Sequence, residues 1–253
     1  HKYQLLQMFQ ILNKKKFLVD YLGHFVDIHN HILPGIDDGA KNISDSLDII
    51  NGFNEIGITH IITTPHVNQN YYPNTAESIH SAHNQVQNKL LDLDLKHIAL
   101  ESSSEYMIDS NFENLLDQKL IAPIRNKFLL VEMPFLQSPI NFDQAIFKIA
   151  TKGYNPILAH PERYFFLHSN YKKYHDYKTK GIFLQLNLLS LSNYYGKQVS
   201  KIAQKLLMDN HIDFAGTDIH NVKQIELLKD IKLSNGILNK LIPILNRNVE
   251  TFY

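Results

Sequence analysis

From residue 25 onward, short aliphatic or β-branched runs alternate with longer stretches that carry apolar residues at helical spacing. This alternation is typical of repeated βα units, in which neighbouring strands lie parallel and helices cover them. The predicted strands occupy residues 25–28, 58–64, 97–101, 128–132, 155–159, 182–187 and 212–216. The predicted helices occupy residues 44–56, 75–92, 111–118, 141–152, 170–180, 196–210 and 237–247. The pattern therefore predicts an α/β fold with seven strands.

The first predicted helix illustrates the signal. Leu47, Ile50 and Phe53 recur at helical spacing, so they share one face that can pack on a sheet. Ser44 is a suitable residue to cap the first turn, and Gly57 follows the last turn. Both ends of this helix are therefore predicted from local chemistry.

The organisation of the chain favours one domain. No repeat, low-complexity tract or Pro/Gly/Ser-rich linker divides the 253 residues, and a β/α barrel needs about 250. We therefore expect a single barrel over residues 23–253. Residues 1–22 place leucines at helical spacing beside the lysines at 14–16. We expect them to form an N-terminal arm, with a short amphipathic helix as its candidate structure, packed outside the barrel rather than on a membrane.

Composition narrows the partners and the chemistry. Lys plus Arg equals Asp plus Glu at 25 each, so no net charge recruits nucleic acid. The chain has no Cys, so any bound metal must be held by imidazole and carboxylate groups. We find no run of roughly 18 apolar residues, the minimum for a membrane span. These features favour a cytoplasmic protein without a membrane span.

Residues that can bind metal recur at the predicted strand ends. In a β/α barrel the C-terminal ends of the strands meet on one face, where active sites are built. Eight such residues, which are far apart in the sequence, are therefore predicted to meet in one pocket. They are His29, His31, His66, Glu105, Glu132, His160, Asp218 and His220.

The local spacing within two of these groups supports a metal site. His29 and His31 are separated by one residue, so in an extended segment both side chains point the same way. Asp218 and His220 are expected to repeat that geometry at the last strand. One His-x-His motif alone is more often structural than metal-binding. The recurrence at successive strand ends is what favours a metal centre.

The number of candidate ligands exceeds what one ion needs. A tetrahedral ion takes four ligands, and a bridging carboxylate, with Glu132 or Asp218 as the best candidates, would hold two or three ions roughly 3.5–4 Å apart. Mixed imidazole and carboxylate donors suit manganese, iron or zinc better than calcium. At the third strand Glu101 competes with Glu105, which we prefer.

Three further features border the predicted ligands. Arg163 follows His160 closely and could grip two phosphate oxygens, the alternative being a pair with Glu162 or a surface acid. Asp37 and Asp38 precede a glycine, which predicts a turn; the second interpretation is that one of them hydrogen-bonds to His29 or His31 and orients it. Aromatic residues at 71–72, 164–166 and 194–195 follow predicted strands and could form a rim for a flat leaving group, or could simply anchor loops.

Taken in order, these motifs resemble the bacterial tyrosine-protein phosphatases of capsule and exopolysaccharide operons, within the polymerase and histidinol phosphatase superfamily. The resemblance runs over roughly residues 25–220. It departs from the family pattern at Asn30 and in the segment Ser102–Glu105, and it has no counterpart for residues 1–22. The motifs that carry it are Asp27–Lys41, Thr64–His66, Glu132–Pro134, Ala159–Tyr164 and Gly216–His220.

The resemblance implies a distorted seven-stranded (β/α)7 TIM-like barrel and a multinuclear centre that favours manganese. It also implies that Arg163 is the catalytic arginine. The expected reaction is hydrolysis of phosphotyrosine in the tail of a bacterial tyrosine autokinase that controls polysaccharide export. The sequence does not indicate an oligomeric state.

Several other functions remain as alternatives. The same centre could serve a small-molecule phosphatase, such as one for histidinol phosphate, or a nuclease-like phosphodiesterase, which the neutral charge disfavours. An amidohydrolase would need a lysine for its carbamate, and the fourth strand offers Glu132 instead. A metal-stabilised binding module without turnover is disfavoured because the full set of ligands and Arg163 is present.

Overall fold

The computed structural model describes residues 15–253, so most of the predicted N-terminal arm lies outside the described residues. Its described part begins with strand β1 (Lys16–Phe17), which pairs antiparallel with β11 (Lys232–Leu233). A 3-10 helix, η1 (Leu18–Tyr21), follows. Leu18 and Leu22 are fully buried. The end of the arm is therefore packed against the domain.

All seven predicted strands are present, and their pairing is parallel. One sheet contains β2 (Val26–Asp27), β3 (His60–Thr63) and β5 (Ala99–Ser102). The second sheet has the order β10-β9-β8-β7-β6-β4. Its strands are β4 (His66–Val67), β6 (Glu105–Met107), β7 (Phe128–Glu132), β8 (Asn155–Ala159), β9 (Phe183–Asn187) and β10 (Phe214–Gly216). The predicted α/β fold with parallel strands is confirmed. The single closed barrel stays a prediction, because these strands divide into two sheets.

The division arises directly after the second and third predicted strands, where the chain leaves the first sheet and continues as a second short strand. Thr64 and Pro65 separate β3 from β4, and proline has no N–H to give to a ladder. The neighbouring strand breaks at the matching place, between β5 and β6. Both continue in step, because β4 and β6 pair with His66 opposite Glu105. This paired break brings two of the predicted ligands side by side.

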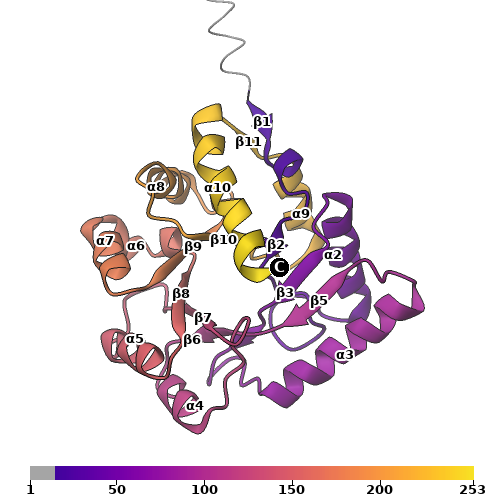
Figure 1. The fold of residues 1–253 in the computed structure, drawn as a ribbon, viewed down its shortest axis with the longest axis horizontal. Coiled ribbons are helices and arrows are strands. Elements are labelled where there is room, and N and C mark those ends of the chain that lie inside the picture. The colour runs from indigo at the N-terminus through magenta and orange to yellow at the C-terminus, as the bar shows by residue number, and fades with distance from the viewer. Residues whose placement is uncertain (1–14) are drawn as a thin grey trace, which may run out of the picture.

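Helices surround the strands (Figure 1). They are α2 (Ile43–Glu55), α3 (Ala76–Asp92), α4 (Phe112–Gln118), α5 (Phe142–Thr151), α6 (Phe165–His168), α7 (Lys172–Thr179), α8 (Lys197–Met208), α9 (Val222–Lys229) and α10 (Asn235–Phe252). Every predicted helix is present, while the short α6 and α9 were not predicted. Asn42, rather than Ser44, caps α2 by accepting from the backbone N–H of Asp45. Within residues 15–253, no helix has the length and apolar character that crossing a bilayer requires.

Apolar side chains fill the space between the strands at the end opposite the predicted ligands. The rings of Phe128, Phe214 and Phe252 meet there, with centroids 4.9–5.8 Å apart. Phe252 comes from the end of α10, which runs between β10 and β2 (Figure 1). The strand N-termini are therefore closed by a packed core, and polar groups are left to the other end.

Asn248 of α10 connects the first and last parallel strands. Its side-chain N–H groups donate to the carbonyls of Val26 and Ala215 at 3.0 and 2.8 Å, and its oxygen accepts from the Ala215 N–H at 3.0 Å. The residue is fully buried. One side chain therefore satisfies backbone groups of β2 and β10, which do not pair with each other at this level.

Replacing Asn248 by Ala should destabilise the fold. Three buried backbone groups would lose their partner, and leaving such groups unsatisfied costs about 1–3 kcal/mol each. We expect the free energy of unfolding in urea to fall by at least that amount. Asn246→Ala, an exposed position on the same helix, should change it little. Equal effects of the two changes would show that the Asn248 contacts are not needed to hold the two strands.

Candidate metal centre

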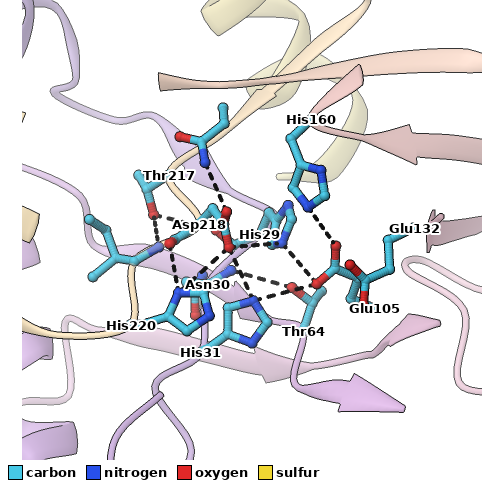
Figure 2. A network of polar contacts seen from close by, with 12 residues as sticks. His29, Asn30, His31, Thr64, Glu105, Glu132, His160, Thr217, Asp218 and His220 are labelled. Carbon is cyan, nitrogen blue, oxygen red and sulfur yellow. Dashed lines mark hydrogen bonds and ion pairs between the residues drawn. The ribbon is translucent and has the colours of Figure 1, made fainter. Parts of the chain in front are cut away.

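The eight predicted ligands meet at the C-terminal ends of the strands. Figure 2 labels all of them except His66. His29 and His31 follow β2, His66 begins β4, and Glu105 begins β6. The remaining four come from the ends of the later strands. Glu132 ends β7, His160 follows β8, and Asp218 and His220 follow β10. The structure thus brings together residues that the sequence places on six strands.

The donor atoms form overlapping groups of metal-binding size. Within each group the ligand atoms lie within 4.8 Å of one another. The groups are His29, His31 and Asp218; His29, Glu105 and His160; His66, Glu105 and Glu132; and His31, Asp38, His66 and His220. The cluster as a whole is therefore a candidate metal site.

Glu105 occupies the centre of the cluster. Its Oε2 lies 3.2 Å from His29 Nε2 and 3.1 Å from His66 Nδ1, and its Oε1 lies 3.2 Å from His160 Nε2. The sequence favours Glu132 or Asp218 as the shared carboxylate, whereas in the structure each belongs to one donor group and Glu105 belongs to two. The break between β5 and β6 accounts for this, because it turns Glu105 inward beside β4.

Several of these donor atoms are buried and have no hydrogen-bond partner. They are Nε2 of His29, Nε2 of His31, Nδ1 of His66 and both oxygens of Glu105. Leaving buried polar atoms unsatisfied is costly, and native proteins rarely do so without a reason. A divalent cation accepts such nitrogen and oxygen donors. The donor set therefore fits a metal on its own chemistry.

In His29 and His31, the ring nitrogen Nδ1, which is not the proposed donor to the metal, contacts a polar side chain. His29 Nδ1 lies 2.8 Å from Gln185 Oε1, and His31 Nδ1 lies 2.9 Å from Asp37 Oδ2. Contacts of this kind fix the ring orientation and tautomer, so that Nε2 faces the metal side. The secondary expectation that Asp37 or Asp38 supports one of the two histidines thus agrees with the position of Asp37.

Two further polar residues that the sequence analysis missed belong to the same site. Asn187 donates to Asp218 Oδ2 at 2.8 Å, and Gln185 comes from the same strand, β9. Both are fully buried. They alternate with Leu184 and Leu186, so polar residues at every second position of an otherwise apolar strand were the available signal.

Asp38 is a donor candidate that the sequence analysis did not single out as a ligand. Its Oδ1 lies 3.4 Å from His66 Nε2 and 3.5 Å from His220 Nε2, and about half of its side chain is exposed. The turn that carries it needs Gly39, because a Cβ there would collide with the backbone of His31. Asp38 therefore lies on the open side of the cluster.

The two glutamates near the third predicted strand lie in different environments. Glu101 lies outside the cluster, 2.9 Å from His60 Nε2 and 2.8 Å from Arg125 Nη2. Glu105 is fully buried within it. Glu105, and not Glu101, is therefore placed among the possible metal ligands.

Two donor residues adopt left-handed backbone conformations. His160 has a φ of 35° and Asp218 a φ of 54°. The expectation that Asp218 and His220 repeat the extended geometry of His29 and His31 is therefore wrong, since β10 ends at Gly216 and the chain turns at Asp218. Strained residues of this kind cluster at functional sites, where the surrounding structure holds them.

Arg163 lies against the cluster. Its Nη1 donates to Asp218 Oδ2 at 2.6 Å, and its guanidinium carbon lies 4.3 Å from the Tyr195 ring centroid and 4.9 Å from that of Phe135. The alternative pairing with Glu162 is wrong, because Glu162 turns inward and accepts from the Asn187 N–H. The guanidinium is thus held between two rings at the edge of the site.

Two carboxylates of the cluster, Glu105 and Asp218, have pKa values held below their usual range. Burial raises the pKa of Glu105, but the facing imidazoles of His29 and His66 hold it well below its usual range. Burial likewise raises the pKa of Asp218, and His29, His31 and Arg163 are among the groups that bring it well below its usual range. Both groups are therefore anionic and available as ligands at neutral pH.

Aromatic rings border the mouth of the cluster. Tyr72 stacks on His66 with centroids 5.5 Å apart, and Phe135 stacks on His160 at 5.7 Å. Tyr195 covers Arg163. Of the three predicted rim segments, 71–72 and 194–195 reach the mouth. In the third, Tyr164 is buried and accepts from the Met133 N–H, whereas Phe165 is exposed and lines a pocket with Arg163. Phe135 was not predicted.

Comparison with known proteins agrees with the geometry. Tyrosine-protein phosphatase YwqE of Bacillus subtilis is 32% identical over 198 residues, which cover 78% of each chain. Tyrosine-protein phosphatase CpsB of Streptococcus agalactiae is 26% identical, over 78% of this chain and 83% of that protein. A solved structure, from a study of YwqE from Bacillus subtilis and CpsB from Streptococcus pneumoniae as metal-dependent tyrosine phosphatases, matches with a TM-score of 0.79 and 29% identity. It covers 90% of this chain and 93% of the solved one.

These matches confirm the resemblance that the sequence motifs indicated. The model of the family described as capsular polysaccharide synthesis, CpsB/CapC, matches residues 25–227, which include all eight predicted ligands and Arg163. This chain is therefore a member of the CpsB/CapC family of capsular polysaccharide synthesis.

Proposed function

We propose that this chain is a metal-dependent phosphatase that hydrolyses phosphotyrosine in proteins. The observation that carries the proposal is the contact between Arg163 and Asp218, at 2.6 Å, which places a guanidinium against the donor cluster. Relatives at 26% and 32% identity carry the name tyrosine-protein phosphatase. Cation donors and a phosphate-binding side chain at one mouth are the parts that this reaction needs.

Nine residues form the proposed metal-binding set: the eight predicted from sequence, with Asp38 added by its position. Divalent ions bound there would supply positive charge and lower the pKa of a water molecule, which provides the nucleophile. The donors suit two or three ions, with manganese favoured and iron or zinc as alternatives. The identity and number of the ions stay predictions.

Arg163 is the proposed catalytic residue. Asp218 engages only Nη1, so the rest of the guanidinium fork can donate to the nonbridging oxygens of a phosphate held at the cluster. Such charge-assisted contacts strengthen as negative charge develops in the transition state. Tyr195 and Phe135 keep the guanidinium in place and separate part of it from water. Arg163 would thus both orient the phosphate and stabilise the developing charge.

The rim supports an aryl phosphate as the substrate. Tyr72, Phe135 and Tyr195 present ring faces beside the cluster. A tyrosyl ring leaving the mouth would pack against such faces better than an alkyl chain would. The tail of a tyrosine autokinase as the partner, and the cytoplasm as the location, stay predictions.

We also infer that the two parallel sheets together make one distorted (β/α)7 barrel over residues 23–253. Three contacts between the first and last strands support this. Asp27 accepts from the Thr217 hydroxyl at 2.6 Å, and Asn30 and Ile219 form a parallel bridge. The side chain of Asn248 donates to backbone carbonyls of both strands. The barrel would be irregular because β2 and β10 meet through side chains as well as through the backbone.

The metal content of the protein tests the proposed centre. We expect more than one equivalent of transition metal per chain by elemental analysis after reconstitution with manganese, loss of activity on chelation, and recovery with manganese. His160→Ala should lose metal and activity together. His175→Ala, an exposed histidine on α7, should lose neither. One equivalent or less in the unmutated chain would overturn the multinuclear assignment.

Replacing Arg163 tests the phosphate pocket. Arg163→Ala should slow turnover by roughly 10²–10³-fold, the scale seen when one preorganised charge-stabilising donor is removed. The metal content should persist, because guanidinium is not a ligand. Lys should restore only part of the rate, since it lacks the planar two-point grip. Arg247→Ala, at a more exposed arginine that contacts Asp213, serves as the matched control. Near-normal turnover of Arg163→Ala would make the residue structural.

Substrate preference separates the proposal from a small-molecule phosphatase. With manganese present, kcat/KM for a phosphotyrosine peptide should exceed that for histidinol phosphate, because the rim offers ring faces. Both substrates should be assayed on one preparation of known metal content. A preference for histidinol phosphate would favour the small-molecule alternative.

A further inference from the structure

We propose that a pocket on the outer side of Arg163 binds an apolar side chain that flanks the phosphotyrosine in a substrate polypeptide. The pocket has a volume of about 210 Å³ and is lined by Phe135, Arg163, Phe165, Tyr195 and Val199. This inference rests on the proposed function and deepens it. It adds a requirement for sequence around the phosphorylated tyrosine.

The position of the pocket sets it apart from the reacting group. Arg163 touches both the pocket and Asp218, so the guanidinium lies between the pocket and the donor cluster. No residue of the donor cluster lines the pocket. A phosphate gripped by Arg163 at the cluster therefore leaves the pocket free. A side chain one or a few residues away can reach it, because an extended chain advances about 3.3 Å per residue.

The lining indicates what the pocket accepts. Phe135, Phe165, Tyr195 and Val199 present carbon, and the one charge, on Arg163, is already paired with Asp218. An aliphatic or aromatic side chain would bury apolar surface there, and a ring could also lie near the guanidinium face. Pockets for whole small ligands measure about 300–1,000 Å³. At about 210 Å³ this one suits a single side chain.

The surface next to the pocket also fits a polypeptide. Phe165 is 55% exposed, and Leu136, the residue after Phe135, is 92% exposed. Large apolar side chains gathered at one edge of a site mark a contact surface for a larger partner. A small metabolite held at the cluster would not extend over these side chains. The exposed residues therefore favour a peptide chain lying across the mouth.

The test varies the neighbours of the phosphotyrosine. A set of peptides in a glycine–serine background would each carry one phenylalanine at a different position on either side of the phosphotyrosine. With the manganese-loaded protein we expect one position to raise kcat/KM by about tenfold over the plain peptide, the scale of burying one apolar side chain. Phe165→Ala should remove that advantage while leaving kcat/KM for the plain peptide and for p-nitrophenyl phosphate unchanged.

Phe147→Ala, an exposed phenylalanine on α5 outside the pocket, is the matched control and should keep the advantage. The proposal is overturned if no position of phenylalanine helps the unmutated protein, or if Phe165→Ala slows all three substrates equally. That second result would show that Phe165 contacts the phosphotyrosine ring itself or positions Arg163. Absence of activity on every tyrosyl phosphate would instead reject the proposed function, and this inference with it.

Discussion

The burial of Glu105 is the constraint on which the rest of the site depends. Placing a carboxylate in the interior is expensive unless opposite charges or cations face it. Here three imidazoles approach its two oxygens at 3.1–3.2 Å, and those oxygens still lack hydrogen-bond partners. A cluster of donors around an unsatisfied anion is a stable arrangement mainly when cations complete it. The architecture is therefore organised around a charge that the protein alone compensates only in part.

The paired strand breaks explain how this charge reaches its position. β3 and β5 both end after four residues, and the chain resumes pairing as β4 and β6, with His66 opposite Glu105. The same breaks divide the parallel strands into two sheets. Regularity of the sheet is thus lost where the ligands are placed, and contacts through Asp27, Thr217 and Asn248 hold the first and last strands together.

Arg163 connects this interior to the surface. One side of the guanidinium meets Asp218, and the aromatic rings of Phe135 and Tyr195 flank it. Beyond it lies a small apolar hollow next to exposed apolar side chains. A substrate bound at this mouth would meet charge toward the interior and apolar surface toward the outside, which is the polarity of a phosphotyrosine within a polypeptide.

The sequence by itself determined the seven strands, the main helices and the positions of the eight donors. These follow from patterns of period 2 and 3.6, and from polar residues placed directly after apolar runs, all of which are local. Only the tertiary structure decided the central place of Glu105, the addition of Asp38 and the inward turn of Glu162. It also decided the left-handed conformation of Asp218 and the division of the parallel strands into two sheets. These features depend on the register between distant strands and on backbone conformations that residues outside the local segment hold, so no local pattern could predict them.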